Sequence, residues 1–204
     1  MKKSLATTSL LAGLILLIFL VYARTTDAQG SSESSQIQIG MNIAPVHLDL
    51  KGKNRSLVGL GSYIVNAQGG CNDCHTWRVT QEPPNFGSNY EEGGDPFLGQ
   101  PEQIYAAGYL AGGRKFGPFT SRNLTPNGDG LPARLTLDLF ITTLRTGVDS
   151  KSGHPQISPL LQVMPWPVYQ DMTDRDLHAV YEYLRSIPCI EGDPGEPPPT
   201  SPRC

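Results

Sequence analysis

The chain has 204 residues, a length that suggests one domain or at most two small ones. Its 22 glycines and 18 prolines make up close to a fifth of the chain, against about 12% in average proteins, which excludes a compact helical bundle with short loops. A net charge of −3 disfavours nucleic-acid binding, because phosphate contacts need a clustered basic surface.

The first segment, residues 1–28, has the pattern of a secretory signal peptide. Two lysines precede an apolar run of 12 residues, 10–21, which suits a signal core and is short for a membrane span of about 20 residues. The small residues Thr26 and Ala28 predict cleavage before Gln29. The alternative is an uncleaved anchor. We therefore expect an exported, periplasmic protein that contacts the membrane only if this segment is retained.

Residues 29–55 are expected to form a loosely ordered lead-in arm before the domain. The start is rich in serine, and apolar residues alternate at Ile37, Ile39, Met41 and Ile43. This alternation is compatible with a short strand, or with an arm that lies on the domain.

Helices are expected at residues 56–68, 137–146 and 174–186, where apolar residues recur at helical spacing. Residues 78–132 hold much of the glycine and proline, with one helix-like patch near residues 101–110. No alternating run is convincing as a sheet. Capping residues are expected at Thr136, Gly147 and Thr173.

The motif that carries the chemistry is Cys71-Asn-Asp-Cys74-His75, the C-x-x-C-H signature of haem c attachment. Two cysteines three residues apart can reach the two vinyl groups of one porphyrin edge. The adjacent His75 then presents its imidazole to the iron as the proximal ligand. Covalent attachment suits an exported protein, from which a diffusible cofactor could be lost. The motif predicts one covalently bound haem c.

Three other interpretations of the motif remain open. A thioredoxin-like redox pair needs a βαβ pattern, which the sequence lacks. A structural zinc site needs four ligands, and Cys189 and Cys204 do not supply a second closely spaced pair. A disulfide between Cys71 and Cys74 would leave His75 unexplained.

The second axial ligand is sought among the methionines and histidines. Met172 has a structural alternative as a hydrophobic staple before the last helix. Met164 is followed by Pro165-Trp166-Pro167, and these prolines stiffen the loop, which favours Met164 as the weak thioether ligand. The alternative for Met164 is a gap-filler in the core. The full set of candidates is Met41, His47, His154, Met164, Met172 and His178.

A family resemblance runs over residues 56–188. The segments CNDCHT, SRNLTPNGDGLP, TLDLFITTLRTGVD and VMPWPVYQDMTDRDLHAVYEYLRSIP resemble class I mono-haem cytochromes c. They are also similar to single haem modules in the cytochrome c subunits of membrane-bound alcohol and gluconate dehydrogenases. The chain departs from those subunits in having only one C-x-x-C-H, and from small soluble members in its longer stretch between His75 and Met164.

The resemblance implies an all-α, cytochrome c-like fold, with few helices around one covalently bound haem and long Gly/Pro-rich loops. It implies that Cys71 and Cys74 attach the haem, and that His75 and Met164 ligate the iron. The Asn-Leu-Thr-Pro segment is expected near the haem, with Arg122 pairing with a propionate. A solvated surface arginine is the alternative for Arg122.

The C-terminal tail, residues 189–204, is rich in proline and has a cysteine at each end. We expect a Cys189–Cys204 disulfide to hold this tail. The alternatives are that Cys204 is a free thiol or pairs between chains.

The favoured function is a periplasmic carrier of single electrons, not an enzyme, working between a donor dehydrogenase or quinol-oxidising complex and an acceptor. Its expected partners are redox proteins: dehydrogenases, oxidases or other cytochromes. One alternative is a haem enzyme or gas sensor whose distal ligand can be displaced. Another is a tightly docked subunit of a dehydrogenase complex.

Overall fold

The computed structural model describes residues 32–78, 88–149, 159–191 and 204. The predicted signal peptide, residues 1–28, lies outside them. The chain divides into a short N-terminal unit, Met1–Gln36, and a compact unit, Ile37–Cys204. Of the first unit only residues 32–36 are described, and they are helical.

Residues 32–43 form a helix, so the short strand that the alternation allowed is wrong. Ile37 and Met41, one helical turn apart, pack against the core, whereas Ile39 and Ile43 stay 45% and 39% exposed. The four apolar residues satisfy both periodicities, and burial follows the helical one because i and i+4 lie on one face.

The second helix is continuous with a π-helical turn: α2 spans Arg55–Tyr63 and η1 spans Ile64–Gln68. Together they confirm the helix predicted at residues 56–68. The helix begins one residue early because the side chain of Asn54 accepts hydrogen bonds from the first turn. η1 ends where Gly69 N–H donates to Ile64 O at 2.6 Å.

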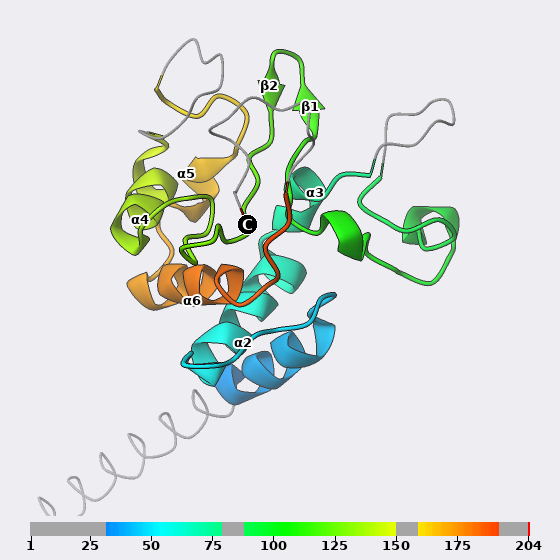
Figure 1. Ribbon diagram of the computed structural model, residues 1–204, viewed down its shortest axis with the longest axis horizontal. Helices are drawn as coiled ribbons and strands as arrows, with labels where there is room; N and C mark the ends of the chain where they lie inside the picture. Colours follow the sequence, from blue (N-terminus) through cyan, green and yellow to red (C-terminus); the bar gives the residue numbers. More distant parts are fainter. Residues whose placement is uncertain (1–31, 79–87, 150–158, 192–203) are drawn as a thin grey trace, which may run out of the picture. The chain divides into compact units, whose positions relative to one another are not determined.

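Helix α6, Asp174–Leu184, crosses α2 at close range (Figure 1). The approach depends on Gly61, because a Cβ there would lie 2.5 Å from the carbonyl carbon of Ala179 and 2.7 Å from Tyr183 Cβ. The helix begins as predicted, with Thr173 accepting from Asp176 N–H and donating to its carboxylate at 2.8 Å.

Helix α4 spans Leu137–Thr146, the predicted range. Thr136 caps its start by accepting from Leu139 N–H, and Gly147 ends it in the left-handed conformation, with φ of 71°. A short helix, α5, spans Trp166–Tyr169 and lies between Met164 and α6 in the chain.

The motif helix α3 spans Cys71–His75. The remaining elements lie in the Gly/Pro-rich stretch that follows it: the 3₁₀ turns η2 (Pro96–Leu98) and η3 (Ala106–Gly108), and strands β1 (Lys115–Phe116) and β2 (Phe119–Thr120). β1 and β2 pair antiparallel, so the chain is mostly helical with a small two-stranded sheet and is not plainly all-α. The helix predicted near residues 101–110 is wrong. This range contains only the 3₁₀ turn η3, and Leu110 has a left-handed φ of 55°, which is incompatible with a continuing helix.

The core is assembled from α2, η1, α4 and α6, together with Tyr109 and Leu110 from the irregular stretch. A buried polar cluster joins three of these segments. The Tyr109 hydroxyl lies 2.9 Å from that of Tyr183 and donates to Asn66 Oδ1, on η1, at 2.5 Å. These bonds satisfy hydroxyls that burial would otherwise leave unpaired. Among the described residues, no helix is both long enough and apolar enough to cross a membrane.

Candidate functional site

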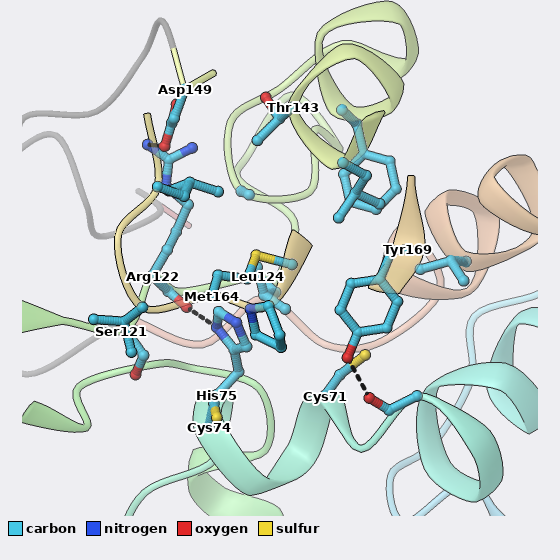
Figure 2. Close-up of a pocket in the computed structure, with 18 of the residues that line it drawn as sticks. Cys71, Cys74, His75, Ser121, Arg122, Leu124, Thr143, Asp149, Met164 and Tyr169 are labelled. Carbon is cyan, nitrogen blue, oxygen red and sulfur yellow. Dashed lines mark hydrogen bonds and ion pairs between the residues drawn. The ribbon is translucent and has the colours of Figure 1, made fainter. Parts of the chain in front are cut away.

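The motif forms one short helix, α3, immediately after two glycines. Gly70 adopts a left-handed φ of 58°, which reverses the chain between η1 and α3. Within α3, Cys71 and Cys74 are three residues apart and therefore share a face. Both line one cavity together with His75 (Figure 2). The helix thus presents all three chemical groups of the motif to the same space.

The imidazole of His75 is buried and oriented by the backbone. Its Nδ1 lies 2.7 Å from Arg122 O, and a carbonyl oxygen only accepts, so Nδ1 carries the proton. Nε2 is then left unprotonated and free to ligate a metal. Burial lowers the pKa of His75, which keeps the ring in the neutral form that metals bind.

Gly112 brings the accepting carbonyl to His75. Its N–H donates to His75 O at 2.7 Å. A Cβ on Gly112 would lie 2.6 Å from three backbone atoms of residues 121–123. Only glycine therefore allows that segment to run close enough for Arg122 O to reach the ring.

The two cysteine thiols differ from those of a redox dithiol. Burial raises the pKa of Cys71 to about 12, and it also raises the pKa of Cys74. A thioredoxin-like pair works through a lowered thiol pKa, so that interpretation is disfavoured. Cys71 and Cys74 are not joined to each other, and the described residues contain no group of three or more His, Cys, Asp or Glu side chains that could hold zinc.

The cavity has a volume of about 350 Å³, within the range of about 300–1,000 Å³ typical of ligand sites. Its walls are largely apolar and come from η1, α4, α6 and the β1–β2 ribbon, which contributes Phe116 and Phe119. Further apolar lining residues are Ile64, Val65, Leu124, Leu135, Phe140, Leu144, Leu161, Leu177, Val180 and Leu184. A large, apolar group fits this lining better than a polar substrate.

Two of the candidate second ligands line the cavity, Met164 and Met172. Figure 2 shows Met164 directed into the same space as His75 and the two cysteines. Met41 packs outside the cavity, against α2, and the cavity lining does not include the exposed His47 or the half-exposed His178. His154 lies outside the described residues.

The segment that carries Met164 is anchored to the end of α4. Leu161 N–H donates to Gly147 O at 2.8 Å, and Asp149 N–H donates to Pro159 O at 3.1 Å. The ring of Trp166 lies against Gly147, where a Cβ would overlap it. The Met164 side chain therefore starts from a backbone fixed at both ends.

Arg122 is buried in an ion pair with Asp149. Its Nη2 lies 2.8 Å from Asp149 Oδ2, and the two side chains are 11% and 3% exposed. A solvated surface arginine is therefore wrong for this position. Burial lowers the pKa of Arg122, and the facing carboxylate of Asp149 opposes that shift. Arg122 thus serves the site twice, through its carbonyl on His75 and its guanidinium at the cavity wall.

The segment around Arg122 alternates between two faces. Arg122 and Leu124 line the cavity, whereas Asn123 and Thr125 are fully buried on the other side. Asn123 Nδ2 donates to Ile190 O at 2.8 Å. The resemblance placed this segment near the haem, and the alternation explains how it also holds the start of the tail.

The tail is closed by a Cys189–Cys204 disulfide, as predicted. Cys204 N–H also donates to Glu191 Oε1 at 2.7 Å. Cys204 is therefore held next to the start of the tail, and its sulfur is not a free thiol.

Three residues of the site were missed from the sequence. Asp149 ends the segment TLDLFITTLRTGVD, but the sequence assigns it no role. Gly112 is one of many glycines. Tyr169 and Gly69 both line the cavity, and the Tyr169 hydroxyl donates to Gly69 O at 2.7 Å. The aromatic position of Tyr169 just after the Met164 loop was the one available signal.

One curated protein is similar to this chain: the cytochrome c subunit of alcohol dehydrogenase (quinone) from Gluconobacter oxydans (strain 621H). The two are 29% identical over 136 residues, which is 65% of this chain and 24% of the relative. The chain thus spans about a quarter of the length of that relative. This similarity supports a cytochrome c-like relation. No family profile matches the chain, and no solved structure matches it.

Proposed function

We propose that this chain is a periplasmic c-type cytochrome that carries single electrons through one haem c attached to Cys71 and Cys74. The observation that carries the proposal is the convergence of these two cysteines and the Nε2 of His75 on one apolar cavity. Bound there, the haem iron would cycle between its ferrous and ferric states, one electron at a time. The relative, a cytochrome c subunit, supports the same assignment.

The residues of this chain fit such a group in several independent ways. Arg122 O fixes the tautomer of His75 and holds the ring in one orientation. The apolar walls exclude water, and a drier site favours the neutral over the charged state of any metal centre within it. The guanidinium of Arg122 lies at the wall in its ion pair with Asp149, and a propionate there would share it with that carboxylate.

Met164 is our proposed second ligand, with Met172 as the competing side chain. The anchoring of Met164 on both sides limits its freedom, as a weak thioether ligand requires. Met172 lies just before the Thr173 cap; both methionines pack against the core, so the anchoring of the backbone around Met164 is what favours it. Methionine ligation would raise the reduction potential above that of two histidines.

The electron donor would be a dehydrogenase or a quinol-oxidising complex. The similar protein is a subunit of a quinone-linked alcohol dehydrogenase, which favours a partner of that kind. Export to the periplasm would follow from the segment before Gln29. A tightly docked subunit differs from a transient carrier only in how long the two proteins stay together.

The cofactor is tested with the full chain, expressed in a host that matures c-type cytochromes. We expect a pyridine haemochrome spectrum of one haem c per chain, retained through acid–acetone extraction. Cys71→Ser with Cys74→Ser should abolish covalent attachment, whereas Cys189→Ser, the matched control, should retain it. Haem that is extracted from the native protein, or absent from it, would overturn the assignment.

The axial ligands are tested in the same preparation. Met164→Ala should lower the reduction potential and open the iron to cyanide or carbon monoxide, whereas Met172→Ala should leave both properties close to those of the native protein. An unchanged low-spin spectrum and potential in Met164→Ala would refute Met164 as ligand. Rapid carbon monoxide binding by the native protein would favour the gas-sensor or enzyme alternative over an electron carrier.

A further inference from the structure

Residues 88–105 form a loop, which we call the acidic loop. Its base is an antiparallel bridge between Tyr90 and Ile104, beside which Tyr105 N–H donates to Asn89 O at 2.9 Å and Glu91 N–H donates to Gln103 O at 2.8 Å. Its tip is η2, which carries Phe97 and Leu98, 87% and 73% exposed. Phe97 and Leu98 are adjacent and are among the most exposed large apolar side chains of the described residues.

The tip is held rigidly, although it is exposed. Asp95 Oδ1 accepts from Phe97 N–H at 2.9 Å, and Gln100 Oε1 accepts from Asp95 N–H at 2.9 Å. Leu98 N–H donates to Asp95 O at 3.0 Å, and the Phe97 ring meets Tyr90 edge-on, with centroids 6.4 Å apart. The two apolar side chains therefore start from a fixed backbone, which reduces the entropy lost when they become buried against another molecule.

The acidic loop is joined to the motif helix. Asn89 Nδ2, near the base of the loop, donates to Asp73 Oδ1 at 3.2 Å, and Asp73 lies in α3 and lines the cavity. A protein that binds the loop would thereby be placed beside the motif helix.

The charge of the loop indicates the kind of surface it would meet. Residues 88–105 contain four acidic residues, Glu91, Glu92, Asp95 and Glu102, and no lysine, arginine or histidine. Glu92 lies 3.6 Å from Arg78 but is 91% exposed, so that pair is weak. Such a loop is repelled by an anionic membrane and attracted by a basic protein surface.

We propose that the acidic loop docks the electron-exchange partner, with Phe97 and Leu98 entering an apolar pocket bordered by lysine and arginine side chains. The inference deepens the proposed function and rests on it. The apolar tip supplies the buried centre of the contact and the carboxylates supply its rim, the arrangement typical of protein interfaces. The partner would be a protein with a basic surface, and a lipid surface or a second copy of this chain are the competing outcomes of the test.

The test measures electron delivery to the full-length holoprotein. The probe is a washed membrane preparation from the source organism with this gene deleted, supplied with an oxidisable alcohol under anaerobic conditions. Reduction of the added holoprotein is followed by its haem absorbance as a function of its concentration. The variants are Phe97→Ala with Leu98→Ala, Glu91→Gln with Glu102→Gln, and the control Val168→Ala, whose side chain is also 73% exposed but lies on α5.

The tip variant should raise the half-saturating concentration at least about tenfold, equivalent to about 1.4 kcal/mol of binding, with the maximal rate and reduction potential unchanged. Val168→Ala should change it less than about twofold. Raising ionic strength from about 10 to about 150 mM should weaken binding of the native protein more than that of the glutamate variant.

Other results would overturn the proposal. A tip variant that saturates like the native protein, or an equal loss in Val168→Ala, would remove the acidic loop as the docking surface. Tip-dependent binding to protein-free vesicles of phosphatidylcholine or phosphatidylglycerol would assign the tip to lipid. Tip-dependent dimerisation in sedimentation would assign it to a second copy. A native holoprotein that the membranes cannot reduce, with alcohol or with an added quinol as the electron source, would instead refute the electron-carrier function, and the docking proposal with it.

Discussion

Gly147 should link the stability of the fold to the hold on Met164. It ends α4 with a left-handed φ of 71°, which costs an alanine about 1–2 kcal/mol. A Cβ there would lie 2.7 Å from Trp166 Cδ1 and closer still to Nε1 and Cε2. The rigid indole would have to withdraw by at least about 0.7 Å to reach an ordinary contact of about 3.4 Å, a form of overpacking that costs about 1–3 kcal/mol.

Gly147→Ala should therefore lower the free energy of unfolding by about 2–5 kcal/mol, measured by urea denaturation of the holoprotein. The matched control is Gly130→Ala, because Gly130 has nearly the same φ, 74°, and nothing within 4 Å of its Cβ position. That variant should lose only the backbone part, about 1–2 kcal/mol. The difference between the two variants isolates the contact with Trp166.

The same substitution should loosen the loop that carries Met164, because Trp166 lies two residues after Met164 and Gly147 O accepts from Leu161 N–H. If about 1–3 kcal/mol of the loop's stability is lost, cyanide should displace the proposed Met164 ligand with about 5–150-fold higher affinity. Gly130→Ala should leave cyanide affinity unchanged. Equal losses of stability in both variants, within about 0.5 kcal/mol, would refute the steric argument.

Three further predictions concern the fold around the site. Gly61→Ala should destabilise the protein by about 2 kcal/mol in urea denaturation, since its Cβ would collide with the backbone of Ala179 and the helices would have to separate. Asp149→Asn should cost about 3 kcal/mol, because Arg122 would keep a buried charge without its carboxylate. Cys204→Ser should cost about 3 kcal/mol by opening a loop of 15 residues, and reduction of the native protein should reproduce that loss.

Controls exist for the first two of these variants. Ser56→Thr adds a methyl group on the exposed start of α2 and should stay within about 0.5 kcal/mol of the native protein. Asp174→Asn breaks the ion pair of Arg145, whose acidic partner is 86% exposed, and should cost at most about 1 kcal/mol. A loss in Asp174→Asn equal to that in Asp149→Asn would mean that burial does not set the strength of these pairs.

The helices were predictable where the sequence carried both a periodic apolar face and a cap. Helix α4 has its predicted bounds, and α6 begins at the predicted Thr173 cap and ends two residues earlier than expected. Both signals are local, so a single sequence contains them. The disulfide was also predictable, because Cys189 and Cys204 were the two cysteines left outside the motif.

The residues that depend on contacts far apart in the sequence were not predictable in the same way. The burial of Arg122 requires Asp149, 27 positions away, and no pattern relates the two. The helix at residues 32–43 was missed because an alternating apolar series also satisfies helical spacing, and tertiary packing decides between them. The ribbon β1–β2 is too short to leave a period that could be recognised.

The glycine and proline excess can now be assigned to particular tasks at the site. The carbonyls inside a helix point along its axis and already accept one backbone hydrogen bond, whereas a carbonyl of irregular chain can be directed at a ring nitrogen. Gly112 shows how this works, because its missing Cβ lets residues 121–123 pass at contact distance and present Arg122 O to His75. Gly147 likewise leaves room for the ring of Trp166, next to the segment that carries Met164. The helices thus supply the apolar walls, and the glycines set how closely the irregular chain approaches the groups that would hold the iron.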